Sequence, residues 1–153
     1  MDSESATRAV SLLAEADREF NQWMGLRILS VEPGQVSLGM TVAPHMANSQ
    51  EFCHGGMLFS LADSACAYAV ASGNVNPATT DAAISYLAPA RVGDALVAVA
   101  RLIHRGRRLT RCTVEISTDS GVPLVVYQAS CFHRGEVVSA RQDKDGSLPD
   151  AGG

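Results

Sequence analysis

The sequence predicts an α+β domain in which a curved antiparallel sheet of about six strands wraps around one long central helix, with a further helix at the N-terminus. The stretch 56–72 is apolar on nearly its whole circumference, which is typical of a buried helix. Six other stretches have the alternating or β-branched composition of strands: 26–31, 35–42, 78–87, 95–104, 109–119 and 122–133. A curved sheet can cover most sides of a single helix with that many strands.

The composition agrees with one well-packed domain. The 153 residues are enough for one domain of ordinary size and too few for two. Hydrophobic residues make up 46% of the chain, which permits a full core and excludes a disordered protein. Charged residues make up 18%, below the roughly 25% of an average soluble domain, which is consistent with an oligomer that covers part of the surface. The net charge of −4 argues against a nucleic-acid-binding surface.

The sequence also predicts where the protein works. No apolar run approaches the ~18 residues of a membrane span, and the most apolar stretch, 57–71, contains Asp63. The N-terminus, MDSESATRAV, begins acidic and lacks the order of a secretory signal, so we expect a cytoplasmic protein. The four cysteines show no CxxC spacing and lie in apolar runs, so we expect buried, reduced thiols and no metal site: Cys53, Cys66, Cys112 and Cys131.

The elements follow in a simple order. The N-terminal helix is expected over residues 6–24, with Gly25 as its stop signal, and Pro33-Gly34 predicts a hairpin turn between the first two strands. The central helix is expected from Gly56 through Ser72. The whole chain is expected to form one domain, with its core over about residues 20–135 and a flexible polar tail over residues 136–153. The apolar positions of the N-terminal helix are Val10, Leu13, Ala14, Phe20, Trp23 and Met24.

Asp63 is the residue that least fits its surroundings. It lies in the middle of the central helix and is the only charged residue between Glu51 and Asp81. A carboxylate among apolar side chains is usually paired, protonated or part of a functional cavity, because burying a lone charge is costly. The alternative is that Asp63 faces solvent at an edge of the helix. We favour the functional interpretation.

Gly55 and Gly56 stand where the central helix begins. The first amides of a helix have no partners within the helix and lie at the positive end of its dipole, so they can bind an oxyanion. Glycine lets a ligand approach those amides closely. The alternative is that the pair only permits a tight turn.

The spacing of Gly55 and Asp63 has a consequence for assembly. Eight residues of helix separate them by roughly 12 Å, since each residue adds ~1.5 Å. An oxyanion donor and a base must both lie within ~3 Å of one reacting group. Two antiparallel copies of the helix, related by a two-fold axis, can bring Gly55 of one chain to Asp63 of the other. The sequence therefore predicts a site that requires a dimer.

The segment Cys53–Ala69 (CHGGMLFSLADSACAYA) closely resembles the central-helix signature of the hotdog-fold acyl-CoA thioesterases, in particular those of the phenylacetic-acid-degradation type. The likeness continues through Ile84–Ala90 (ISYLAPA), Gly93-Asp94 and His104–Arg108 (HRGRR), and spans about residues 20–135. The combination of HGG, Asp63 at this spacing and the two downstream segments makes the resemblance specific.

The resemblance implies a sheet wrapped around one helix, a dimer whose sheets join edge to edge, and a tetramer of two dimers. It implies hydrolysis of a thioester between coenzyme A and an acyl group, here an aromatic, phenylacetyl-like or hydroxyphenylacetyl-like one. Coenzyme A would be part of the substrate, and neither a separate cofactor nor a metal is implied.

The resemblance also implies roles for single residues. Gly55 resembles the backbone oxyanion donor, and Asp63 the carboxylate that activates water or attacks the thioester itself. Asn48 resembles the amide that places the water or carbonyl, and His54 the signature histidine that shapes the start of the helix. A hydroxyl on the next strand assists in some members, and here Thr79 and Thr80 are both candidates.

Arginines of the C-terminal half are candidates for coenzyme A binding. Arginine suits multivalent phosphate recognition, and coenzyme A carries a pyrophosphate and a 3′-phosphate. The alternative is a solvated hairpin turn with spare charge. The resemblance favours phosphate binding at Arg105, Arg107 or Arg108.

Two other functions compete with the thioesterase. An acyl-thioester dehydratase or hydratase on the same fold would use His54 with Asp63 as acid and base, but the segment around His54 matches the thioesterases better. A non-catalytic acyl-CoA-binding module would keep Gly55 and the arginines without needing Asp63. The retained carboxylate argues against that module.

Overall fold

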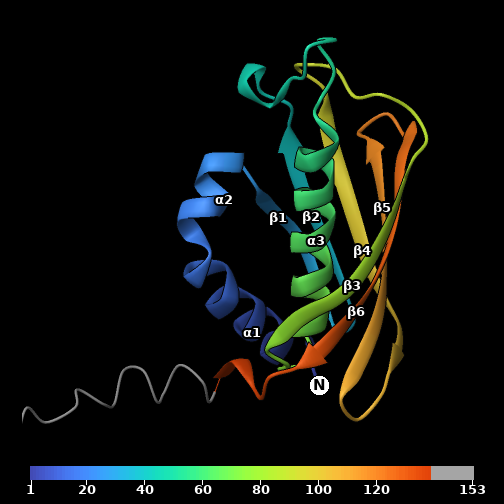
Figure 1. Ribbon diagram of the computed structural model, residues 1–153. Coiled ribbons are helices and arrows are strands. Elements are labelled where there is room, and N and C mark those ends of the chain that lie inside the picture. Colours follow the sequence, from blue (N-terminus) through green and yellow to red (C-terminus); the bar gives the residue numbers. More distant parts are fainter. Residues whose placement is uncertain (139–153) are drawn as a thin grey trace, which may run out of the picture.

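The computed structural model describes residues 1–138 and has the predicted architecture: a six-stranded antiparallel sheet curved around a central helix (Figure 1). The central helix α3 lies against the sheet, and the N-terminal helices lie on its other side. The strand order is β1-β2-β4-β5-β6-β3, so β1 and β3 are the edge strands. The elements are α1 (Ser3–Ala16), α2 (Arg18–Met24), β1 (Arg27–Glu32), β2 (Gln35–Thr41), the 3-10 helix η1 (Pro44–Met46), α3 (Gly55–Ala71), β3 (Pro77–Tyr86), β4 (Ala95–Arg105), β5 (Leu109–Thr118) and β6 (Pro123–His133).

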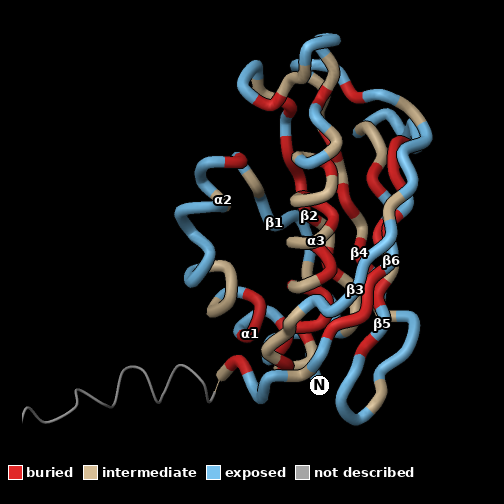
Figure 2. The backbone as a smooth tube through the Cα atoms, viewed as in Figure 1, coloured by how far each residue is buried: buried red, intermediate tan, exposed pale blue. Residues whose placement is uncertain are grey.

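The core lies between α3 and the inward-facing side chains of the strands. Buried residues alternate with less buried ones along β5 and the first half of β4, and β2 and β6 are also largely buried; Figure 2 shows these buried positions along the inner strands. Many inward residues are small, such as Ala98 and Ala100 on β4, and they face a helix that is itself rich in alanine. Small side chains on both surfaces let the helix lie close to the sheet.

The central helix carries much of the stability of the domain. Leu61 on α3 is fully buried in the main core. Replacing Leu61 by alanine removes buried methyl groups and leaves a cavity, so we expect the free energy of unfolding to fall by about 2–5 kcal/mol. Urea unfolding followed by circular dichroism measures this loss. A loss below about 1 kcal/mol would contradict the central position of α3 in the core.

The sequence predicted that the central helix is buried on nearly every side, but the structure leaves part of it less buried. Nine of its 17 residues are buried, whereas Asp63 and its neighbours Ser60 and Ser64 are only half-buried. The sheet and α1 cover the remainder of the helix. A single chain therefore leaves one stripe of α3 partly open to solvent.

The prediction of one N-terminal helix over residues 6–24 is wrong. The helix breaks at Asp17, whose backbone (φ −95°, ψ 10°) leaves the helical range. The Tyr68 hydroxyl of α3 donates to Asp17 Oδ2 at 3.2 Å and accepts from Asn21 Nδ2 at 2.8 Å, which holds the two segments at an angle. The break leaves Phe20 and Trp23 exposed, contrary to their predicted packing, whereas Met24 is buried and Gly25 ends α2 in the left-handed conformation (φ 67°).

The start of the predicted tail is packed. Val137 is buried in a small cluster with Ala9 and Ala71, and the amide of Val138 donates to Asn74 Oδ1 at 3.0 Å. The flexible tail was predicted from residue 136, so these contacts correct its first residues. Its remainder, 139–153, lies outside the described residues.

Two further sequence expectations concern the cysteines and the helices. The four cysteines are free and buried, as predicted. Within residues 1–138, the helices are too short or too polar to cross a bilayer.

Candidate active site

Asp63 accepts two side-chain hydrogen bonds from the sheet. The Tyr127 hydroxyl on β6 donates to Asp63 Oδ1 at 2.7 Å, and the Thr79 hydroxyl on β3 donates to the same oxygen at 3.0 Å. The half-buried carboxylate is therefore neither a freely solvated helix-edge group nor an isolated buried charge. Its second oxygen, Oδ2, accepts no hydrogen bond from residues 1–138 and is available to a reactant.

The structure distinguishes Thr79 from Thr80. An irregularity in the pairing of β3 with β6 places Thr79 opposite Cys131 and Asp81 opposite Ser130, so Thr80 is the extra residue of a β-bulge. Side chains alternate between the two faces of a strand, and the bulge turns Thr79 toward α3 in place of Thr80. The Thr80 hydroxyl instead contacts Asp81 and the Ser130 carbonyl.

Tyr127 is the site residue that sequence reasoning missed. It is fully buried, and its ring meets Phe59 of α3 edge to face, with centroids 5.4 Å apart. Burial raises the pKa of Tyr127 far above its usual value, and the hydrogen bond to Asp63 adds to the effect. The phenol therefore stays protonated and acts as a hydrogen-bond donor. The only sequence signal was the inward position of Tyr127 in an alternating strand, and that pattern does not separate a functional tyrosine from a core one.

The N-terminus of α3 forms the second part of the site. The Gly55 amide has no acceptor among residues 1–138, while the Gly55 carbonyl accepts a hydrogen bond from the Tyr86 hydroxyl at 2.9 Å. A Cβ atom at Gly55 would lie 3.1 Å from the Tyr86 ring, so any larger residue there would require this exposed ring to shift. The exposed amide fits the predicted oxyanion donor.

His54 and Asn48 serve mainly to shape this end of the helix. His54 is the N-cap of α3, and its Nδ1 accepts from the Gly56 amide at 2.9 Å, which agrees with its expected role at the helix start. Asn48 Oδ1 accepts from the amides of Gln50 and Phe52 at 2.9 and 3.2 Å. Backbone amides of the loop thus already bind the side-chain oxygen of Asn48. Of its side-chain amide, only the Nδ2 group remains for a ligand.

A pocket of about 330 Å³ opens beside Gly55. One wall comes from the loop before α3, with Asn48 and Phe52, and the other from the end of β3 and the residues after it, with Tyr86 and Leu87. Its lining is largely apolar apart from the Asn48 amide and the end of α3. The pocket can hold an acyl group with its carbonyl near the Gly55 amide.

The predicted phosphate-binding arginines lie at the turn between β4 and β5. Arg107 and Arg108 are exposed there, whereas Arg105 Nη2 donates to the Gly73 carbonyl at 3.2 Å, just past the C-terminal end of α3. Arg105 therefore already has a structural contact in this chain. This turn and Gly55 lie at opposite ends of α3 (Figure 1).

The single chain assembles two half-sites and does not join them. Asp63, Thr79 and Tyr127 form one, whereas Gly55, Asn48 and His54 form the other, eight residues away on the same helix. That is roughly 12 Å at ~1.5 Å per residue, too far for one reacting group to contact both.

Comparison with known proteins agrees with this geometry. Residues 50–136 match the family model of the thioesterase superfamily. Acyl-coenzyme A thioesterase PaaI of Escherichia coli is 32% identical over 116 residues, which cover 76% of this chain and 83% of that protein. The structure of E. coli PaaI, from the phenylacetic acid degradation operon, superimposes with a TM-score of 0.85 at 30% identity over 89% of this chain and 98% of that one.

A thioesterase of Streptococcus pneumoniae solved with coenzyme A has a TM-score of 0.71 and 25% identity, over 72% of this chain and 90% of that one. The matches include the central helix with Gly55 and Asp63 and the strands that carry Thr79 and Tyr127. The chain therefore belongs to the thioesterase superfamily, has its hotdog fold, and is a thioester hydrolase.

Proposed function

We propose that this protein hydrolyses aromatic acyl-CoA thioesters, such as phenylacetyl-CoA, at sites shared between two copies of the chain. The observation that carries the proposal is the Asp63 carboxylate, held through Oδ1 by Thr79 and Tyr127 and free at Oδ2, on the partly open stripe of α3. In a thioester hydrolase, such a carboxylate supplies the base or the nucleophile.

Two routes use the same residues. In the first, Asp63 Oδ2 takes a proton from water as the water oxygen bonds to the thioester carbonyl carbon. The tetrahedral intermediate then breaks its C–S bond, and the leaving thiolate of coenzyme A takes up the proton that Asp63 removed from water, which regenerates the carboxylate. In the second, Oδ2 itself attacks the carbonyl carbon and expels the thiolate, and water hydrolyses the resulting anhydride. In both routes the Gly55 amide of the partner chain stabilises the negative oxygen.

A dimer is proposed because a single chain leaves its two half-sites apart and its edge strand open. Among residues 1–138, β3 pairs only with β6, and seven of its ten residues are exposed. An edge strand of this length offers unpaired amides and carbonyls to another strand. Joining the β3 strands of two copies about a two-fold axis would also cover the half-buried stripe of α3 around Asp63 and bring Gly55 of one chain toward it. We further propose a tetramer of two such dimers and a cytoplasmic location.

Coenzyme A is the proposed thiol of the substrate. The S. pneumoniae relative was solved with coenzyme A, and this chain presents Arg107 and Arg108 at an exposed turn where phosphates can reach them. Arg105 would join them only by releasing the Gly73 carbonyl. An aromatic acyl group is proposed because Phe52, Tyr86 and Leu87 provide apolar walls beside Gly55, and because the E. coli relative comes from a phenylacetic acid degradation operon.

A thiol-release assay tests the substrate class. We expect the enzyme to release free coenzyme A from phenylacetyl-CoA and hydroxyphenylacetyl-CoA, with kcat/KM about tenfold or more above that for medium-chain and long-chain acyl-CoAs, since pocket fit discriminates by about that factor. A preference for long chains would refute the aromatic assignment. Binding of coenzyme A without thiol release from any thioester, or loss of water from a hydroxyacyl-CoA, would refute hydrolysis itself.

A further inference from the structure

Tyr127 makes the shortest side-chain hydrogen bond to the candidate catalytic carboxylate. Its hydroxyl lies 2.7 Å from Asp63 Oδ1, compared with 3.0 Å for Thr79. The tyrosine is fully buried, whereas Thr79 lies on the exposed edge strand. A hydrogen bond from a buried donor to a charged group is among the stronger ones in a protein.

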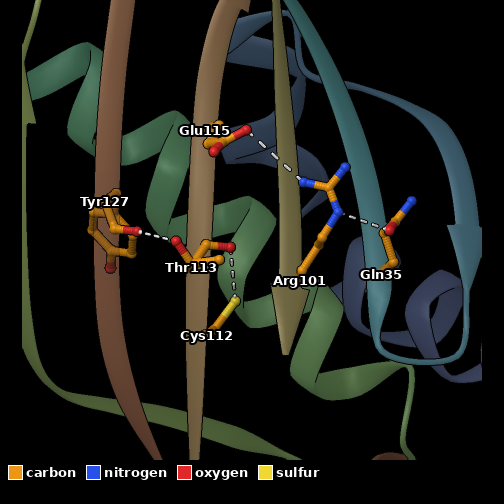
Figure 3. A network of polar contacts seen from close by, with 6 residues as sticks. All are labelled: Gln35, Arg101, Cys112, Thr113, Glu115 and Tyr127. Atoms are coloured by element: carbon orange, nitrogen blue, oxygen red, sulfur yellow. Dashed lines mark hydrogen bonds and ion pairs between the residues drawn. The ribbon is translucent and has the colours of Figure 1, made fainter. Parts of the chain in front are cut away.

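The backbone and ring of Tyr127 are both fixed. The Thr113 hydroxyl on β5 donates to the Tyr127 carbonyl at 3.3 Å, as Figure 3 shows, and Tyr127 is paired with Val114 on β5 and Ile84 on β3. On the inner face of the sheet, Phe59 packs against the ring at an interplanar angle of 80°. These contacts leave the hydroxyl little choice of direction other than toward Asp63.

Both hydroxyls bind the same carboxylate oxygen. Because Oδ1 accepts from Tyr127 and from Thr79, the rotation of the carboxylate about its side-chain bond is restricted. Oδ2, which accepts no hydrogen bond from residues 1–138, is then held in a restricted range of orientations on a half-buried side chain. A carboxylate free to rotate would spend only part of its time with an oxygen in any one direction.

We propose that Tyr127 is a positioning residue for thioester hydrolysis: it holds Asp63 Oδ1 so that Oδ2 is presented to the water or to the thioester carbonyl. The inference rests on the proposed function, because it takes Asp63 as the reacting group. It adds that the donor on β6, and not only the hydroxyl on β3, sets the orientation of that group.

Other titratable groups lie close to the site of Asp63 and Tyr127. Besides the two hydroxyls, the titratable groups nearby are the buried thiols of Cys66 on α3 and Cys131 on β6, and the Asp81 carboxylate on β3, which acts on Cys131. The hydrogen bond from Cys66 lowers the pKa of Cys131, and the thiol also lies 3.8 Å from the Thr79 hydroxyl. No arginine or lysine among residues 1–138 forms an ion pair with Asp63.

The test compares two buried tyrosines that differ in what they contact. Tyr127→Phe removes the hydroxyl from Asp63 and keeps the ring against Phe59. Tyr68→Phe is the matched control, because Tyr68 is equally buried on α3 but binds Asp17 and Asn21 of the N-terminal helices. We expect kcat to fall about 10- to 100-fold in Tyr127→Phe with KM nearly unchanged, as for the loss of a group that orients a base. We expect kcat of Tyr68→Phe to stay at the wild-type value.

A double variant separates positioning from a general structural role. In an Asp63→Asn background, Tyr127→Phe should leave the residual rate unchanged, because the tyrosine acts only through the carboxylate.

A wild-type kcat in Tyr127→Phe would overturn the inference even if Asp63→Asn is inactive. Full activity of Asp63→Asn would overturn the proposed function instead. Thermal melting of each variant reports folding. If Tyr127→Phe does not fold, Tyr127→Met, whose flexible side chain can fill the space, should show the same loss of kcat.

Discussion

Replacing Asp63 by asparagine should lower kcat for thioester hydrolysis by about 10³-fold, within the range found when a positioned base is removed. Asparagine has nearly the same shape and can still accept the hydrogen bonds of Thr79 and Tyr127 through its amide oxygen. It cannot take a proton from water or attack the carbonyl carbon. The loss should therefore fall on chemistry, and steady-state kinetics of thiol release measures it.

Two controls accompany the Asp63 variant. Asp119→Asn makes the same chemical change at an exposed residue of the β5–β6 turn and should keep the wild-type kcat. The melting temperature and the affinity for coenzyme A should be nearly unchanged in Asp63→Asn, since asparagine can keep the contacts with Thr79 and Tyr127 and the carboxylate is proposed to meet the substrate only at its reacting centre. A rate within a factor of a few of wild type would rule out Asp63 as the base or the nucleophile.

Two inactive variants should restore each other when their chains are mixed. Gly55→Pro removes the proposed oxyanion donor, and proline is well tolerated as the first residue of a helix. His54 has an extended backbone (φ −58°, ψ 136°), the conformation that a residue before proline adopts. The exposed Tyr86 ring must move aside to accommodate the new side chain, so circular dichroism should verify the fold of this variant.

The hydrolysis rate of the mixture tests whether each site is built from two chains. When Gly55→Pro and Asp63→Asn chains are refolded or coexpressed together, half of the randomly paired dimers are mixed, and each mixed dimer has one intact site. We therefore expect about a quarter of the wild-type rate from a mixture of two nearly inactive parents. A mixture no more active than its parents would show that Gly55 and Asp63 do not act across a subunit boundary.

Much of the fold follows from the local pattern of side chains. The apolar circumference of residues 56–72 identified the central helix. The alternation of strand residues identified the six strands, and each observed strand end lies within one residue of the predicted one. Burial acts on each side chain separately, so a periodic pattern records which face is covered. The same reasoning placed Gly25 at the end of α2 and a turn at Gly34, where the backbone needs a positive φ.

Apolar spacing gave a wrong prediction at Asp17, where a residue far away in the chain contacts the N-terminal helices. The spacing of apolar residues over 6–24 continues through Asp17, yet the helix breaks there, where Tyr68, 51 residues away, binds Asp17 and Asn21. Apolar spacing also predicted that Phe20 and Trp23 are packed, and the break turns them to solvent. A hydrogen bond to a remote helix leaves no periodic trace in the sequence.

By itself the sequence determined the fold and singled out Asp63 and Gly55 as candidate site residues, because a lone charge and a glycine pair are visible as exceptions to a local rule. Only the tertiary structure decided that Thr79 and not Thr80 binds Asp63, and that Tyr127 completes the site. The first depends on one extra residue in a strand pairing, and the second on which of several inward side chains lies opposite Asp63. Strand register is set by contacts between segments far apart in the chain, so neither could be predicted from local spacing.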